Sequence, residues 1–270
     1  MNKMLRVAVG SGWCDVSTAS YDTVSLDVSG EDGFPRGIAF KLDGTKLYLI
    51  GGYYDSVYQY SLSTAWDLST ASYDTVSFSV QEQEGSPRSV TFKTDGTKMY
   101  VVGSGDVVYQ YSLSTAWNVD TASYDSVSFG VSGQDTSVAS VTFKTDGTKM
   151  YVLGGVTDKV YQYSLSTPWN LDTASYDSVS FYLGDEDPNP RSMAFKPDGT
   201  KLFVISGTND VVYKYSLSTP WNVSTAFYDS TSPYLGIQDL DPYGLAFKPD
   251  GTKMYTLGNE NEKIYQYSLY

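Results

Sequence analysis

A short string that returns five times constrains this chain more than any other feature. The segment FKTDGTK at residues 92–98 recurs in nearly the same form from Phe40, Phe143, Phe195 and Phe247. Its turn aspartates and all five tryptophans follow one period of 51 to 53 residues: Asp43, Asp95, Asp146, Asp198 and Asp250, and Trp13, Trp66, Trp117, Trp169 and Trp221. Repeats of this length are typical of chains built from one supersecondary unit, so the chain is predicted to be a repeat protein.

Each copy contains four short runs rich in β-branched and aromatic residues. In the second copy these runs cover residues 89–92, 98–102, 107–113 and 123–129, and an Asp-Gly turn separates the first two. Gly suits the positive φ of such a hairpin turn, and no run has the 3.6-residue period of an apolar helix. Five copies of four antiparallel strands predict an all-β protein, a five-bladed β-propeller.

The two ends of the chain are incomplete copies that complement each other. The last copy stops at Tyr270, before its Trp connection and fourth strand, and residues 13–28 supply both pieces. We therefore expect residues 13–28 to complete the last blade, whose other strands lie within residues 243–269. The predicted domains are an N-terminal extension at 1–12 and a single propeller at 13–270.

Composition excludes several classes of function. A net charge of −13 and a pI near 4.3 repel phosphate backbones, and no apolar run approaches 18 residues, so neither nucleic-acid binding nor membrane insertion is expected. The chain has no histidine, which excludes His-dependent catalysis and His-ligated zinc, and its single cysteine, Cys14, cannot form an internal disulfide. The start of the chain does not read as a signal peptide.

Two strings resemble known propeller repeats. Residues 195–204, FKPDGTKLFV, resemble the hairpin of WD40-like repeats, and residues 57–78, VYQYSLSTAWDLSTASYDTVSF, resemble repeats of virion and tail-associated proteins of marine bacteriophages. The resemblance implies a non-enzymatic binding or structural module, located in a virion or outside the cell, that contacts a host-surface glycan or another virion protein. A bacterial lectin-like adhesin is the alternative, and a glycosidase-type enzyme is a distant one.

Five aligned acidic residues are candidates for a metal site. They are expected in the connections between blades, on one face near the central channel: Asp32, Glu84, Asp135, Asp187 and Asp239. Carboxylates from several blades could hold Ca²⁺, although no cofactor is otherwise implied. Alternatively, each accepts backbone hydrogen bonds in its own turn or pairs with Arg36, Arg88 or Arg191 four residues later.

A ligand site is expected where the fivefold repeat is broken. Most tyrosines occupy repeated strand positions, but the exceptions gather on the acidic face with other unrepeated polar residues: Tyr53, Tyr54, Tyr182, Tyr234 and Tyr243, with Asp187 and Asn189. Aromatic faces beside short polar groups suit neutral polar ligands such as sugars. Drift in exposed loops is the alternative.

The fivefold symmetry also argues against catalysis. Catalytic carboxylates need different environments, and five equivalent acids do not supply them, so the chain is not expected to be an enzyme. The two faces of the propeller are expected to differ electrically. The face opposite the aligned acidic residues is predicted to carry ten hairpin lysines, at Lys41, Lys46, Lys93, Lys98, Lys144, Lys149, Lys196, Lys201, Lys248 and Lys253.

Overall fold

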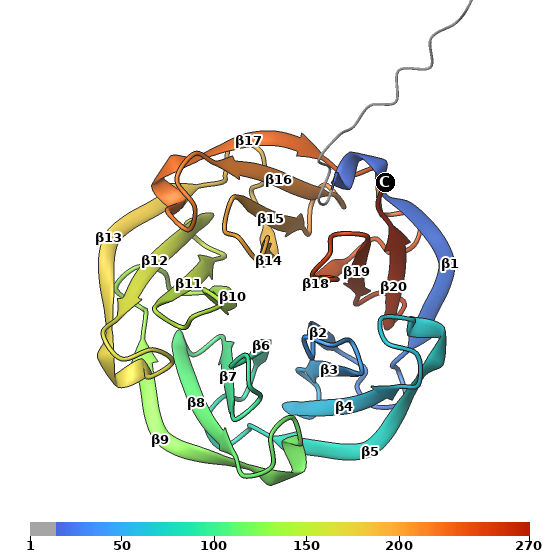
Figure 1. Cartoon of the computed structure of the whole chain (residues 1–270), viewed down its shortest axis with the longest axis horizontal. Coiled ribbons are helices and arrows are strands. Elements are labelled where there is room, and N and C mark those ends of the chain that lie inside the picture. The colour runs from blue at the N-terminus through green and yellow to red at the C-terminus, as the bar shows by residue number, and fades with distance from the viewer. Residues whose placement is uncertain (1–14) are drawn as a thin grey trace, which may run out of the picture.

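The computed structural model describes residues 15–270, which form five four-stranded antiparallel sheets arranged as blades around a central channel (Figure 1). The predicted five-bladed β-propeller is therefore confirmed. The predicted extension at 1–12, with Trp13 and Cys14, lies outside the described residues. No helix within 15–270 is long and apolar enough to span a membrane.

In every blade the strands run outward from the channel in chain order, except that the last blade takes its outermost strand from the N-terminal end. The strands of blades 1 to 5, from the channel outward, are β2 Pro35–Phe40, β3 Lys46–Gly51, β4 Ser56–Leu62, β5 Ala71–Ser79; β6 Pro87–Phe92, β7 Lys98–Gly103, β8 Val107–Leu113, β9 Ala122–Gly130; β10 Val138–Phe143, β11 Lys149–Gly154, β12 Lys159–Leu165, β13 Ala174–Tyr182; β14 Pro190–Phe195, β15 Lys201–Ser206, β16 Val212–Leu217, β17 Ala226–Thr231; and β18 Pro242–Phe247, β19 Lys253–Gly258, β20 Lys263–Ser268, β1 Ser20–Asp27.

A short 3-10 helix precedes each outermost strand. These helices are η1 Val16–Thr18, η2 Leu68–Thr70, η3 Val119–Thr121, η4 Leu171–Thr173 and η5 Val223–Thr225. Each is capped by the side chain of the preceding Asp or Asn, which accepts a hydrogen bond from the second helical N–H, as Asp67 does from Ser69 at 3.1 Å.

The ring closes as the ends of the sequence predicted. Strand β1 pairs antiparallel with β20, so that Tyr21 lies opposite Tyr267 and Leu26 opposite Ile264. Asp22 of β1 accepts hydrogen bonds from Gln266 at 2.8 Å and from Ser268 at 2.6 Å. The first and last described strands therefore belong to one blade and are joined by a strand ladder with one register shift between Tyr21 and Val24.

The hydrophobic core lies between the blades. Each of five buried clusters combines residues of two neighbouring blades, for example Val102 of β7 with Val152 of β11. Tyr48 of blade 1 stacks near Phe92 of blade 2 and donates its hydroxyl to the backbone oxygen of Trp117 at 2.7 Å. The repeated aromatic residues therefore serve blade packing, as expected.

The Asp-Gly turn explains why the hairpin string is repeated. Gly96 has φ +74°, and a Cβ at this position would come within 2.4 Å of the Trp117 ring, so only glycine fits. Asp95 accepts hydrogen bonds from the backbone N–H of Thr97 at 3.0 Å and from its hydroxyl at 2.6 Å. The string is thus a structural corner at which the next tryptophan covers the turn.

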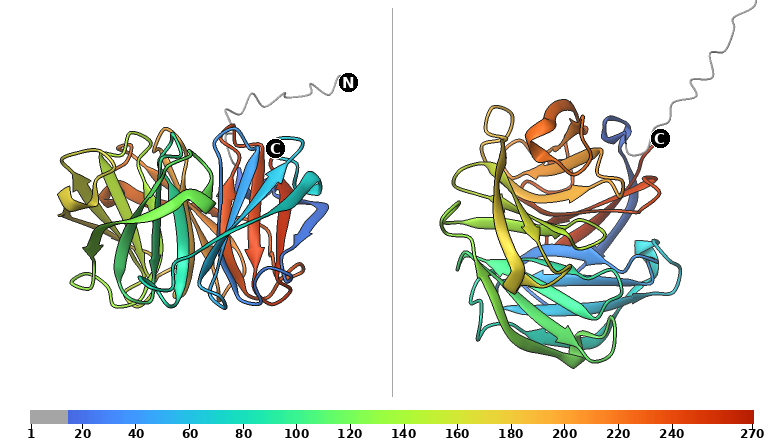
Figure 2. Two further views of the ribbon diagram at one scale, coloured as in Figure 1. Left: turned by 90° about the horizontal axis from the view of Figure 1, so that it is seen from below. Right: turned by 60° about the vertical axis from the view of Figure 1, so that its left-hand side comes forward.

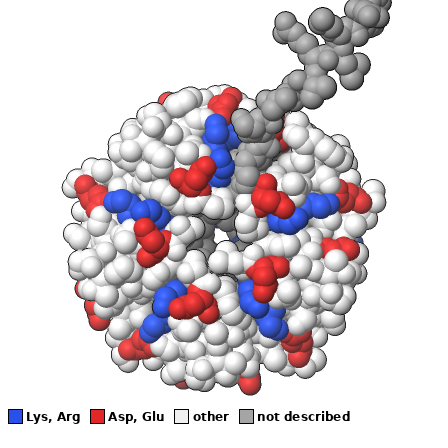
Figure 3. Space-filling model, in the orientation of Figure 1, with Lys and Arg blue, Asp and Glu red and all other residues white. Residues whose placement is uncertain are grey.

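The strand directions place two kinds of connection at opposite ends of the blades (Figure 2). We call the end with turns such as β2–β3 the hairpin face, and the end with connections such as β5–β6 the connection face. The hairpin face is shown in Figure 3, where blue and red side chains lie next to each other around the channel opening.

The ten hairpin lysines lie on the hairpin face as expected, and each of them is paired with a carboxylate. The inner lysine of each blade pairs with the turn aspartate, as Lys41 does with Asp43 at 2.8 Å, and the outer lysine pairs with the outermost strand, as Lys46 does with Asp74 at 3.0 Å. Because each cation lies beside its own anion, the hairpin face has no surplus of positive charge.

Candidate functional site: the channel mouth on the connection face

The five carboxylates predicted as a metal site hold the connection face together. They are buried and stand at Asp32, Glu84, Asp135, Asp187 and Asp239. Asp32 accepts hydrogen bonds from the backbone N–H of Phe34 at 2.8 Å and of Tyr53 at 3.1 Å, which ties the connection before β2 to the β3–β4 turn. Asp135 and Asp239 likewise tie two loops of their blades.

These carboxylates stay in their own blades. No group of three His, Cys, Asp or Glu side chains within residues 15–270 is placed to hold a metal ion. No ion pair joins the five acids to Arg36, Arg88 or Arg191 in this part of the chain, so backbone hydrogen bonding is their main role. Ca²⁺ binding stays a prediction.

Asp187 breaks the equivalence of the five carboxylates. Its Oδ1 accepts from the N–H of Asn189 at 3.1 Å and from Ser206 Oγ at 2.8 Å, while its Oδ2 is buried and has no hydrogen-bond partner. Burial raises the pKa of Asp187 from 3.8 to about 6, and the negative charge of Asp158 adds to the effect. The environment of this acid therefore differs from that of its repeats.

Replacing Asp187 with Asn is expected to stabilise the protein at pH 7 and to flatten its pH dependence. Because the folded-state pKa of Asp187 is raised, its contribution to stability is greatest below pH 4 and is lost as the pH rises towards 6. A shift of two pKa units corresponds to about 3 kcal/mol, which is the upper limit of the gain. Urea unfolding between pH 4 and 7 measures it.

Asp135→Asn is the matched control for this experiment. Both oxygens of Asp135 accept hydrogen bonds, from Ser137 N at 2.7 Å and from Thr157 N at 2.9 Å. In the Asn variant the side-chain NH₂ group would face one of these backbone N–H groups, so two donors would meet. A loss of about 1–3 kcal/mol is expected instead of a gain. Equal losses in both variants would contradict the special environment of Asp187.

The tyrosines predicted as a ligand site do not come together. Tyr53 and Tyr54 are exposed in the β3–β4 turn and contact each other edge to face, with their ring centres 4.7 Å apart. Tyr182 ends the outermost strand of blade 3, and Tyr234 follows the outermost strand of blade 4; both are about half exposed. Only Tyr243 lies on an innermost strand, where it is 9% exposed.

Tyr243 is at the centre of a group of arginines where the channel opens on the connection face. The second residue of each innermost strand forms a ring there: Arg36, Arg88, Ala139, Arg191 and Tyr243. The guanidinium carbons of Arg36 and Arg191 each lie 4.3 Å from the centre of the Tyr243 ring, and that of Arg36 also lies 3.4 Å from the Phe34 ring. The aromatic rings therefore hold two cations side by side.

The three arginines are close enough to affect one another. Burial lowers the pKa of Arg36 from its ordinary value, and the positive charges of Arg191 and Arg88 lower it further. Arg88 donates to Ser137 Oγ at 2.8 Å and to the backbone oxygen of Val138 at 2.9 Å, and Arg191 Nε is buried without a partner. The arrangement concentrates positive charge in a protein whose net charge is −13.

One carboxylate accompanies these cations. Asp241 precedes β18 by one residue, and its Oδ1 lies 3.9 Å from Arg191, while its Oδ2 accepts from Asn259 Nδ2 at 2.9 Å. The aligned positions in the other blades are Phe34, Ser86, Ser137 and Asn189.

A small cavity of about 80 Å³ lies between Arg88, Asn189, Arg191 and Tyr243. We call Arg36, Arg88, Arg191, Asp241, Tyr243 and Asn189 the channel mouth.

The sequence prediction therefore included two residues of the channel mouth and missed four. The prediction names Tyr243 and Asn189, gives Arg36, Arg88 and Arg191 only as partners of nearby acids, and does not include Asp241. The signal was present at one aligned position, which reads Arg, Arg, Ala, Arg and Tyr through the five copies.

Comparison with known proteins supports the fold and little more. No family model and no curated protein matches the chain. A solved structure from Bacteroides uniformis, provisionally described as a 6-phosphogluconolactonase, matches with a TM-score of 0.53 and 14% identity over 86% of this chain and 66% of its own. A Bacteroides fragilis protein with the same provisional description matches with a TM-score of 0.51 and 15% identity over 72% and 53%.

A third similar structure, a protein from Lactobacillus plantarum, has a TM-score of 0.52 and 17% identity over 74% of this chain and 56% of its own. The chain thus spans between about half and two thirds of the length of these proteins. At such identities the likeness shows the β-propeller fold.

The expectation of a non-enzymatic module on a virion or a cell surface is corrected by this comparison. Two of these three structures are provisionally described as enzymes, 6-phosphogluconolactonases, and none of the three is described as a virion protein or an adhesin. The likeness to bacteriophage repeats has no support from family models either. What the chain shares with known proteins is the propeller.

Proposed function

We propose that the protein is a hydrolase that opens a small anionic lactone at the channel mouth. The observation that carries the proposal is the group of three arginines and one aspartate around Tyr243, at positions where the five copies differ. The symmetry argument against catalysis does not apply to these residues, because the blades contribute different side chains.

The arginines suit a substrate that carries a phosphate or carboxylate. A guanidinium presents several N–H groups in a plane and binds such oxyanions through paired hydrogen bonds. Arg191 Nε is buried and unpaired, and the one ion pair that Arg191 forms within residues 15–270, with Asp241, is 3.9 Å long. A bound anion would supply the missing partner and reduce the repulsion among the three cations.

The chemistry needs a base for water and a stabilised oxyanion. In the proposed reaction Asp241 accepts a proton from a water molecule, whose oxygen attacks the lactone carbonyl carbon. The negative charge that develops on the carbonyl oxygen is stabilised by an adjacent guanidinium. The carbonyl then re-forms as the ring C–O bond breaks, and the proton held by Asp241 passes to the departing ring oxygen, which gives a hydroxy acid and restores the carboxylate. Two of the proteins that share this fold are provisionally described as 6-phosphogluconolactonases, which suggests a phosphorylated sugar lactone.

The proposal is tested by measuring acid release from 6-phosphoglucono-δ-lactone and from unphosphorylated glucono-δ-lactone, each corrected for spontaneous opening. We expect the protein to accelerate hydrolysis of the phosphorylated lactone. In Asp241→Asn we expect kcat to fall roughly 100-fold or more. Asp250→Asn, in an exposed turn of the hairpin face, is the control and should keep full activity. Failure to exceed the spontaneous rate with either lactone would refute hydrolysis.

A further inference from the structure

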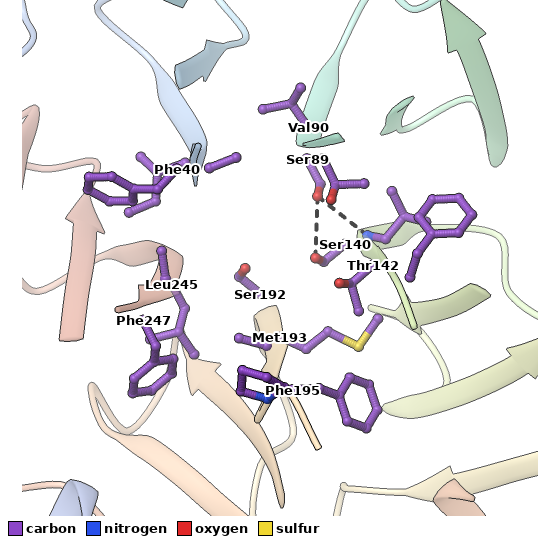
Figure 4. Close-up of a pocket in the computed structure, with 18 of the residues that line it drawn as sticks. Phe40, Ser89, Val90, Ser140, Thr142, Ser192, Met193, Phe195, Leu245 and Phe247 are labelled. Atoms are coloured by element: carbon purple, nitrogen blue, oxygen red, sulfur yellow. Dashed lines mark hydrogen bonds between the residues drawn. The ribbon is translucent and has the colours of Figure 1, made fainter. Parts of the chain in front are cut away.

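The opposite end of the channel contains a second cavity. It has a volume of about 240 Å³ and is lined by the innermost strands β2, β6, β10, β14 and β18 (Figure 4). Figure 3 shows the channel opening on the hairpin face, to which this cavity belongs through Leu42, Pro197 and Pro249 of the hairpin turns. We call this cavity the channel chamber. It shares no lining residue with the smaller cavity at the channel mouth.

The wall of the chamber is polar on one side and apolar on the other. Hydroxyl groups come from three consecutive blades: Ser89, Thr91, Ser140, Thr142, Thr145 and Ser192. At the aligned positions of the two remaining blades the chain has Gly37, Ala39, Gly244 and Ala246. Figure 4 shows Ser89, Ser140 and Thr142 together on one side, and Phe40, Leu245 and Phe247 on the other.

The hydroxyl groups are not equally available to a ligand. Ser89 and Ser140 share a hydrogen bond at 3.3 Å, and Ser89 Oγ also accepts from the N–H of Val141 at 3.4 Å. The Ser192 hydroxyl forms no hydrogen bond within residues 15–270 and lies in the middle of the chamber (Figure 4). The hydroxyls of Thr91, Thr142 and Thr145 are likewise unpaired in this part of the chain, and Ser192 is the free donor and acceptor group that faces the middle of the chamber.

The charge of the lining disfavours ionic ligands. Among the described residues that line the chamber, the only ionisable side chain is Lys248, whose ammonium pairs with Asp250 at 2.7 Å outside the chamber. An ion entering the chamber would lose its water without gaining a counter-charge, which is costly, whereas an uncharged molecule meets no such penalty.

We infer that the channel chamber binds a small uncharged aromatic molecule with one hydroxyl group, a phenol. A cavity of about 150 Å³ lined by apolar side chains is known to admit benzene, so 240 Å³ accommodates a substituted ring. The ring packs against the apolar side, near Phe40, Phe247 and Met193, and its hydroxyl exchanges a hydrogen bond with Ser192. This site does not depend on the function proposed for the channel mouth.

Binding is tested with 4-ethylphenol as the probe, followed by calorimetry and by NMR shifts of the methionine methyl groups. The expected result is saturable binding at millimolar concentration or tighter, with the largest shift at Met193. Ala246→Leu, which fills the apolar side, should abolish binding, and Ser192→Ala should weaken it roughly fivefold. The Ser192→Ala substitution removes only a hydroxyl without a partner, so this variant should fold normally. It keeps the test usable if the Ala246→Leu variant does not fold.

Two comparisons distinguish binding in the chamber from binding elsewhere on the protein. 4-Ethylbenzoate, which has a similar shape and a negative charge, should not bind in the chamber, and Arg191→Met should leave the affinity for 4-ethylphenol unchanged. The inference is overturned if no binding is detected at about 10 mM, a concentration at which even weak fragments of this size bind. It is equally overturned if Ser192→Ala and a folded Ala246→Leu variant both bind as the unmodified protein does.

Discussion

A chain that lacks residues 1–28 is expected to lose its cooperative unfolding transition or to melt far below the full-length protein. The truncation removes β1 and leaves the edge of β20 without its ladder. It also removes Val16 and Val28, which are fully buried, and the ring contacts of Tyr21 with Tyr265 and Tyr267. Burial of each large apolar side chain contributes about 1.5–3 kcal/mol, so the total loss is comparable with the stability of a typical domain.

Thermal unfolding followed by circular dichroism measures this effect, and a synthetic peptide of residues 15–28 provides the control. If the lost stability comes from the missing strand, the peptide should restore the transition in a concentration-dependent way. An unchanged melting temperature in the truncated chain would show that the ring does not depend on β1.

Replacing Arg36 and Arg191 together with methionine is expected to weaken anion binding at the channel mouth by roughly 100-fold or more. Each hydrogen bond to a charged group contributes about 1.5–3 kcal/mol, and methionine keeps much of the apolar contact with Tyr243 while removing the charge. Calorimetric titration with 6-phosphogluconate, the product of the proposed reaction, measures the affinity directly.

The stability of this double variant distinguishes binding from a structural role. Burial lowers the pKa of Arg36 and the positive charges of Arg191 and Arg88 lower it further, so removing both cations should leave the variant no less stable than the parent. Lys41→Met with Lys93→Met is the control, because it removes the same charge from the hairpin face and should leave the affinity unchanged. Unaltered affinity in the arginine variant would contradict the proposed site.

The fold was largely predictable because its causes are local and repeated. The alternation of apolar residues predicts strands, the Asp-Gly turn fits the positive φ of residues such as Gly96, and the incomplete first and last copies predict how the ring closes. The hairpin turns carry the same information in each copy. Each of the five copies therefore specifies the same blade structure.

The candidate site was much less predictable, because it depends on distance from the channel axis. Tyr53 and Tyr182 break the repeat as clearly as Tyr243 does, but they lie in an exposed turn and on an outermost strand. The inner hairpin lysines pair with the aspartate two residues later, whereas the strand ladder brings Asp74 to Lys46 and, from the other end of the chain, Asp22 to Lys253. The position of a residue around the channel is not apparent from spacing within one copy.

The sequence by itself determined the number of blades, the turn geometry and the joining of the two ends, because short-range backbone preferences and a fixed period act within each repeat. Only the tertiary structure decided which side chains meet at the channel. Arg36, Arg191 and Tyr243 are separated by up to 207 residues in the chain. They come together because five innermost strands converge on one axis, which places one residue from every copy in the same small space.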